Sequence, residues 1–275
     1  MKSAVYDVMS KALGAIPFED GDYYNDLLYC GKCNTPKEKD MEFPWGKMRV
    51  RCMCKCQSEK YAEEQRKERE KQRRIQAEQI RSLFPDKAMI SWNFSNDDRK
   101  NPVLSDACKK YVQNFSDLLK AGKGLLFFGP VGTGKTYYAT CIANALIDNG
   151  FRVYVTNFPR LCNKLFHLQD KQDAIDDLNT YDLLVIDDLA SERKTEYMDE
   201  LVWNVIDTRY RAKLPIIITT NLTSEELKNT EISQARIFSR LYEMCTFIPV
   251  DGKDRRANTM KQSYNEMKTL LGLGG

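Results

Sequence analysis

The chain has 275 residues, of which 42% are hydrophobic and 29% charged, and its formal net charge is +3 at pH 7. No apolar run approaches the roughly 20 residues that a membrane-spanning helix needs. The N-terminal segment is interrupted by charges and lacks the apolar stretch of a signal peptide. We therefore expect a cytoplasmic protein with no membrane partner, long enough for one good-sized core and a small accessory module.

Residues 1–57 are predicted to form an N-terminal module that is rich in loops and holds five of the nine cysteines. In a protein that is not exported, cysteines favour thiols or metal ligands over disulfides. Cys30 and Cys33 form a Cys-x-x-Cys pair, and Cys52, Cys54 and Cys56 follow. This spacing is typical of a zinc ribbon or knuckle, in which four thiolates surround Zn²⁺ and leave no open position for catalysis.

The spacing does not decide which of Cys52, Cys54 and Cys56 is spare. In an extended segment the three side chains would face the same way, so an exchangeable set is possible. A cluster of reduced structural thiols is the alternative. The four remaining cysteines lie among apolar neighbours and are interpreted as core residues.

Residues 58–84 are predicted to be a charged linker helix. The segment up to Pro85 has no Gly or other Pro, is crowded with helix formers and has few apolar positions. Between Lys47 and Arg81 the chain carries 12 Lys and Arg against 6 Asp and Glu, so the basic excess is concentrated there. A solvated connector is the first interpretation, and an arm that contacts a partner or nucleic acid is the second.

Residues 85–275 are predicted to form an α/β domain. Short apolar runs predict strands at residues 124–128, 152–156, 183–186, 216–219 and 247–250. Helical patterns fill the gaps between them, notably at residues 135–149 and 196–212. Short apolar strands that alternate with helices indicate a parallel sheet covered on both faces.

A complete G-x-x-x-x-G-K-[ST] motif follows the first of these strands and opens a helix. It consists of Gly129, Pro130, Val131, Gly132, Thr133, Gly134, Lys135 and Thr136, with Tyr137 next. Glycines let successive N–H groups point at phosphate oxygens, and the helix N-terminus adds a favourable dipole. The motif predicts ATP binding, with Lys135 on the β- and γ-phosphates and the Thr136 hydroxyl on Mg²⁺.

Polar residues also end two later strands. Asp187 and Asp188 follow a buried strand, and Asn221 follows the next. Ligand groups of open α/β sheets lie at the carboxyl ends of strands. We expect Asp187 to hold Mg²⁺, Asp188 to orient the attacking water, and Asn221 to contact the γ-phosphate or that water.

Together, GPVGTGKT, LLVIDDLASE, RYRAKLPIIITTNL and RIFSRLYEMC resemble the DnaC/DnaI-type helicase loaders and the related IstB-type transposition ATPases. The resemblance covers roughly residues 85–256 and depends on the order of the motifs. It implies an AAA+ ATPase whose site is completed between subunits. Arg240 matches the family's arginine finger, with Arg236 one helical turn earlier. Arg256 aligns with the family's second sensor, and Arg255 is a possible substitute because the usual Ser-Tyr is missing.

By the same resemblance we expect a helicase loader in DNA replication that binds Mg-ATP and single-stranded DNA. It would self-associate through the ATP site and deliver a hexameric replicative helicase, which the zinc module would grip. Direct DNA contact by that module is the alternative. The rival functions are an IstB-like transposition helper that binds duplex DNA, and a nucleotide-gated adaptor that scarcely hydrolyses ATP.

Four further residues have weaker signals. Trp92 and Phe94 are interpreted as packing residues, with a place in the adenine pocket as the alternative. Arg160 and Lys164 lie where related proteins carry a DNA-contacting helical insertion, so they are candidates for phosphate contacts.

Overall fold

The computed structural model describes residues 19–166, 168, 170–189, 196–228, 232–252, 254–255, 264–265 and 267–271. The chain divides into two compact units, Met1–Gln72 and Arg73–Gly275. The division falls inside a long helix, α2 (Lys55–Ser82). In the part of the chain that the structure describes, no helix has the length and apolar character needed to cross a membrane.

The first unit holds two antiparallel hairpins, β1 (Tyr23–Asn25) with β2 (Leu27–Tyr29) and β3 (Glu38–Phe43) with β4 (Gly46–Arg51). The expectation that this region is rich in loops therefore missed four short strands. Strand β3 begins with three charged residues, and in β4 charged residues alternate with apolar ones. The register sets Asp40 opposite Arg49, with Arg49 Nε 2.9 Å from Asp40 Oδ1. Cross-strand pairs of opposite charge stabilise a hairpin without an apolar core.

Helix α2 begins three residues before the predicted start, at Lys55. Four ion pairs at i, i+4 spacing line its first half, namely Lys55–Glu59, Lys60–Glu64, Glu63–Lys67 and Arg66–Glu70. Such exposed pairs contribute only about 0.3–0.5 kcal/mol each. Ala77 is the one buried residue of the helix, so α2 is the solvated, charged helix that its composition indicates.

The second unit is built on a five-stranded parallel sheet in the order β6-β7-β8-β5-β9. Its strands are β5 (Gly124–Phe128), β6 (Val153–Asn157), β7 (Leu183–Leu189), β8 (Ile216–Thr220) and β9 (Cys245–Pro249). All five strands predicted from sequence are present, with ends shifted by up to three residues. Because β5 lies between β8 and β9, the loop after β5 opens at the point where ligands bind in such sheets.

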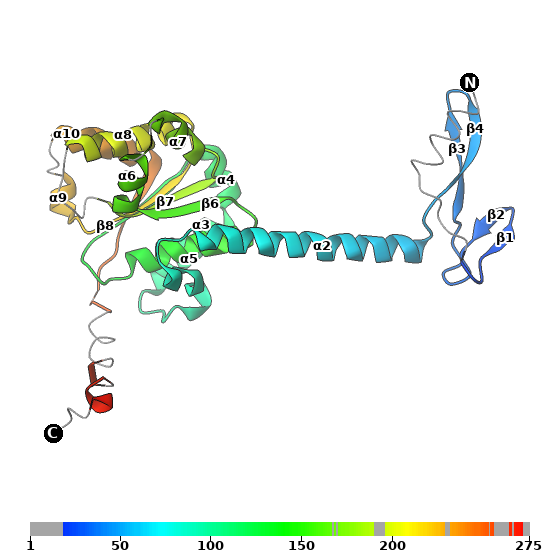
Figure 1. The fold of residues 1–275 in the computed structure, drawn as a ribbon, viewed down its shortest axis with the longest axis horizontal. Helices are drawn as coiled ribbons and strands as arrows, with labels where there is room; N and C mark the ends of the chain where they lie inside the picture. Colours follow the sequence, from blue (N-terminus) through cyan, green and yellow to red (C-terminus); the bar gives the residue numbers. More distant parts are fainter. Residues whose placement is uncertain are drawn as a thin grey trace. The chain divides into compact units, whose positions relative to one another are not determined.

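Helices cover both faces of this sheet (Figure 1). The bounds are α3 (Pro102–Gln113), α4 (Phe115–Ala121), α5 (Lys135–Asp148), α6 (Phe158–Phe166), α7 (Lys171–Leu178), α8 (Glu196–Arg211), α9 (Ser224–Lys228) and α10 (Ile232–Met244), with short 3₁₀ turns η1 (Lys87–Ser91) and η2 (Phe94–Asn96). Alternate strand residues serve opposite faces. Leu125 and Phe127 pack towards α3, α4 and α5, whereas Leu126 packs towards α6, α7, α8 and α10.

Candidate nucleotide-binding site and metal centre

The loop between β5 and α5 is held in shape by its own hydrogen bonds. Lys135 Nζ donates to the carbonyl oxygens of Gly129 (2.8 Å) and Pro130 (2.6 Å), and Thr133 Oγ1 donates to Pro130 O at 2.9 Å. Gly132 has φ +77°, and a Cβ added there would meet Asp254 Oδ1 at 1.8 Å. Only glycine fits this position, so the backbone can approach a ligand closely.

A cavity of about 400 Å³ opens at this loop. It is lined by Trp92, Val131, Gly132, Gly134, Lys135, Thr136, Tyr137, Asp188, Asn221 and Arg255. Most residues of the predicted phosphate loop, together with Asp188 and Asn221, thus meet at one site although they come from three segments. A volume of this size suits a nucleotide-sized ligand.

The ends of β7 and β8 bring the two aspartates to this site. Asp187 is buried, and burial raises the pKa of its carboxyl, while hydrogen bonds from the Thr219 and Thr136 hydroxyls act in the opposite direction. Asp188 lines the cavity and accepts a long hydrogen bond from Asn221 Nδ2 at 3.4 Å. Thr136 and Asp187 are thus hydrogen-bonded neighbours beside the cavity that Asp188 lines, and their role in holding Mg²⁺ stays a prediction.

Thr219 is a residue of this site that sequence reasoning missed. It is fully buried at the end of β8, and its Oγ1 lies 2.5 Å from Asp187 Oδ1 and 3.0 Å from the backbone nitrogen of Asp188. Its only signal in the sequence is a hydroxyl at the end of an apolar strand. Its partner strand, which sequence alone does not give, decides what that hydroxyl contacts.

Two aromatic side chains, Trp92 and Tyr137, line part of the cavity. Trp92 and Tyr137 lie with ring centroids 5.9 Å apart, and Tyr137 Oη donates to Asn93 O at 2.8 Å. Trp92 lines the cavity, but Phe94 does not and instead lies 5.9 Å from Lys109 Nζ. Of the two aromatic candidates for the adenine pocket, the structure brings only Trp92 to the site.

Arg255 closes another side of the cavity. Its guanidinium forms an ion pair with Asp98 at 3.2 Å, and its backbone N–H donates to Gly132 O at 3.0 Å. Arg256, which aligns with the family's second sensor, lies outside the described residues. Arg255 is thus the described arginine of that pair, and it reaches the phosphate loop directly.

Asn144 was also missed, because an asparagine inside a helix is usually a surface residue. It is buried in α5, and its Nδ2 donates to the carbonyl oxygens of Met89 and Trp92, each at 2.8 Å. Its Oδ1 accepts from Arg81 Nε at 2.8 Å. This single amide fixes the segment that carries Trp92 and the last turn of α2 to the helix that follows the phosphate loop.

Arg240 lies on α10 and is not among the described residues that line the cavity. Its Nε pairs with Asp207 Oδ1 at 3.2 Å, and its guanidinium lies over the rings of Tyr210 (4.4 Å) and Trp203 (5.7 Å). The side chain is one-third exposed. Arg236, one turn earlier, is exposed. Arg240 is thus partly exposed, and its role as an arginine finger stays a prediction.

The two basic residues considered for DNA contact both lie on α6 and are exposed. Arg160 Nη1 donates to Phe84 O at 3.3 Å, and Lys164 Nζ lies 5.2 Å from the Tyr154 ring centroid. The structure gives each a partner within the chain, and their role in DNA binding stays a prediction.

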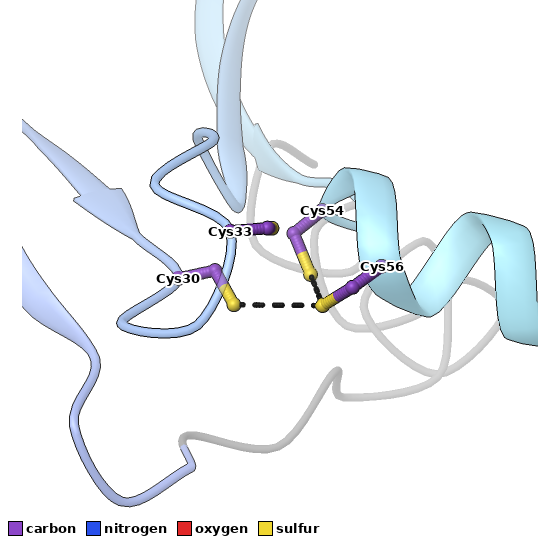
Figure 2. A group of neighbouring side chains, drawn as sticks. All are labelled: Cys30, Cys33, Cys54 and Cys56. Carbon is purple, nitrogen blue, oxygen red and sulfur yellow. Dashed lines mark hydrogen bonds between the residues drawn. The ribbon is translucent and has the colours of Figure 1, made fainter.

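In the first unit, four thiols converge (Figure 2). The Sγ atoms of Cys30, Cys33, Cys54 and Cys56 all lie within 4.8 Å of one another. Cys52 lies outside this group, and its Sγ faces Pro36 O at 3.7 Å. The expectation that the last three cysteines share one extended segment is wrong, since Cys56 lies in the first turn of α2.

The cluster fits a structural zinc ion by its geometry and chemistry. Cys56 Sγ lies 3.7 Å from Cys30 Sγ and 3.3 Å from Cys54 Sγ. In a tetrahedral site with Zn–S bonds of 2.3 Å, neighbouring sulfurs are roughly 3.8 Å apart. Four soft thiolate ligands favour zinc over magnesium or calcium.

Comparison with known proteins places the chain in a family. The model of the IstB-like ATP binding protein family matches residues 55–263, well over half of the chain. The chain belongs to the IstB-like ATP-binding protein family. Its resemblance to the helicase loaders and IstB-type ATPases is thereby confirmed.

Relatives of this IstB-like chain include proteins of two kinds. The replicative helicase loader DnaI of Bacillus subtilis (strain 168) is 26% identical over 202 residues, which cover 67% of this chain and 65% of DnaI. The match thus spans slightly less than two thirds of that relative. The insertion sequence ATP-binding protein y4iQ/y4nD/y4sD of Sinorhizobium fredii is 34% identical over 142 residues, covering 50% of this chain and 46% of the relative.

The crystal structure of the DnaC helicase loader is similar to this IstB-like chain with a TM-score of 0.53 and 29% sequence identity. The likeness covers 60% of this chain and 100% of that one. The parallel sheet flanked by helices is therefore an AAA+ ATPase core, and the fold class predicted from sequence is confirmed.

Proposed function

We propose that this protein is an ATP-dependent loader of a replicative helicase. The observation that carries the proposal is the likeness to the DnaC helicase loader, which extends over the whole of that structure at 29% identity. The similarity to the loader DnaI supports the same function. The separate unit that carries the four-thiol cluster would bind the helicase.

The nucleotide chemistry proposed for the cavity follows from the side chains that meet there. Lys135 would bind the β- and γ-phosphates, and Thr136 and Asp187 would hold Mg²⁺. Asp188, at the cavity wall, would orient the attacking water, and Asn221 would contact the γ-phosphate. Arg255 is the arginine proposed to sense the nucleotide within the same chain.

Self-association would complete the site. Arg240 lies apart from the cavity of its own chain and is partly exposed, which suits a finger offered to the nucleotide of a neighbour. An arginine supplied in trans stabilises the charge on the transferring phosphoryl group. The assembled protein would hold single-stranded DNA, and hydrolysis would release the helicase.

The zinc module would dock the helicase. Within the first unit, Leu28, Cys30, Lys37 and Cys54 are the only buried members of the described residues. So small a core cannot hold a fold, and a Zn²⁺ on the four thiols would supply the missing stability. The metal would then be structural, and its loss would remove the docking surface without touching the nucleotide cavity.

Native mass spectrometry with the hexameric replicative helicase of the organism in which the protein occurs, with and without ATP, tests this proposal. We expect a discrete complex that is lost in Cys54→Ser and kept in Cys52→Ser, because Cys54 belongs to the thiol cluster and Cys52 does not. The absence of a complex in either nucleotide state would contradict the loader function.

The second candidate is a transposition helper that binds duplex DNA. The 34% identity to the insertion sequence ATP-binding protein of Sinorhizobium fredii favours it. Tight binding of duplex DNA by a protein that forms no helicase complex would select this function. ATP turnover no higher than that of Lys135→Ala, with or without single-stranded DNA, would instead indicate an adaptor that works by binding alone.

A further inference from the structure

One hydroxyl connects the two aspartates of the candidate ATP site. Thr219 is the second-last residue of β8 and has no exposed surface. Its Oγ1 lies 2.5 Å from Asp187 Oδ1 and 3.0 Å from the backbone nitrogen of Asp188. The two contacts reach consecutive residues of the neighbouring strand, so one side chain holds the Asp187 carboxylate and the Asp188 backbone.

The direction of these hydrogen bonds follows from the groups involved. The backbone N–H of Asp188 can only donate, so Thr219 Oγ1 accepts there. A hydroxyl has a single proton, and that proton is then available for Asp187 Oδ1. With Oδ1 held, the Asp187 carboxylate cannot rotate freely, and its second oxygen takes a defined direction.

The backbone at Asp188 needs such support. Asp188 has φ +56°, in the left-handed region that non-glycine residues avoid, and the register between β7 and β8 shifts between Ile186 and Leu189. A bulge of this kind re-aims a side chain next to a functional site. Here it accompanies the entry of Asp188 into the cavity wall, while Asp187 before it stays buried.

We propose that Thr219 is a positioning residue that orients the Asp187 carboxylate for Mg²⁺ and fixes the bulged backbone that presents Asp188 to the nucleotide. This inference rests on the proposed ATPase function. Thr219 does not line the cavity and so is not a catalytic residue. Groups that orient the ligands of a metal change metal affinity or activity by about 10- to 100-fold when they are removed.

The test compares Thr219→Val with Thr220→Val. Thr220 is the next residue and equally buried. Its hydroxyl bonds to backbone atoms, donating to Leu189 O at 2.8 Å and accepting from Leu222 N at 3.3 Å. We expect Thr219→Val to lower kcat and raise the Mg²⁺ concentration for half-maximal turnover, together by about 10- to 100-fold. Thr220→Val should keep the wild-type Mg²⁺ dependence, and Thr219→Ser, which retains the hydroxyl, should restore it.

A second readout is the binding of a fluorescent ATP analogue with and without Mg²⁺. Thr219→Val should weaken only the Mg²⁺-dependent part, and an unchanged Mg²⁺ response would overturn the proposal. If Thr219→Val fails to fold, Thr219→Cys replaces it, because a thiol is a weak donor of similar size, and the same comparison decides. Wild-type turnover equal to that of Lys135→Ala would refute the ATPase function, while the binding readout would still test Thr219.

Discussion

The nucleotide site and the cysteine cluster are organised in opposite ways. Around the nucleotide cavity, protein groups hold one another: Thr219 holds Asp187, Asn144 holds the Trp92 segment, and loop carbonyls hold Lys135. In the first unit the side chains that converge are four thiols, and few other described residues are buried. The first site is prepared by its fold, whereas we expect the second to need a bound Zn²⁺ in order to fold.

This difference predicts how each site fails. A substitution in the nucleotide cavity should remove chemistry and leave the structure intact, because a large core on both faces of the sheet surrounds it. A substitution in the thiol cluster should remove the structure of its unit, because metal-binding energy is folding energy in so small a module.

The largest effect is expected for Lys135→Ala, which should reduce ATP turnover by about 100-fold or more, since a charge that stabilises the transferring phosphoryl group is lost. Zinc content should stay at the wild-type level. Turnover with purified protein and metal analysis by mass spectrometry check both. Lys120→Ala, a surface lysine paired with Asp117, is the control. Undiminished turnover in Lys135→Ala would refute the phosphate-loop assignment.

Cys54→Ser should release the zinc, roughly one ion per chain, and make the first unit sensitive to protease. Cys52→Ser should do neither, because its Sγ faces Pro36 O. Chelation of the wild type should act like Cys54→Ser and leave ATP turnover in the absence of a partner unchanged. A parallel loss of zinc and turnover would contradict the independence of the two sites.

Arg240→Ala should lower turnover by about 10-fold or more while ATP affinity stays within a few-fold of the wild type. A mixture of Arg240→Ala with Asp187→Asn should recover part of the activity, because each supplies what the other lacks. Arg236→Ala, one helical turn away and exposed, is the comparison. Failure of every mixing ratio would argue against a site shared between subunits.

The smallest effect is expected at the aromatic wall. Trp92→Ala should raise the KM for ATP by about five- to tenfold with little change in kcat, because stacking on the base contributes to binding alone. Phe94→Ala should leave both constants unchanged, since its ring does not line the cavity. Equal effects of the two substitutions, measured by steady-state kinetics, would remove the base-binding role of Trp92.

Sequence predicted the features that depend on local pattern. The strand over Gly124–Phe128, the helix that starts at Lys135 and the order of the motifs match the structure. Local patterns are sufficient there because the spacing of apolar residues reflects which side chains are buried, and the residues at the ends of an element reflect capping.

Features that depend on non-local register could not be predicted in this way. The bulge at Asp188 and the contacts of Thr219 exist only because β7 and β8 are neighbours with a shifted register. That Cys52 lies outside the thiol cluster depends on where the chain turns into α2, at Lys55. The hairpin of β3 and β4 was missed because it contains many acidic and basic residues, so the alternation of apolar and polar residues that predicts a strand is weak.

The amide of Asn144 has a mechanical consequence. This amide on α5 forms hydrogen bonds of 2.8 Å with Arg81 and with the carbonyl oxygens of Met89 and Trp92. Bonds of this length hold the three groups closely to α5. Helix α5 starts at the phosphate loop. We therefore expect that, if α5 tilts when phosphate binds, the last turn of α2 and the segment that carries Trp92 move with it.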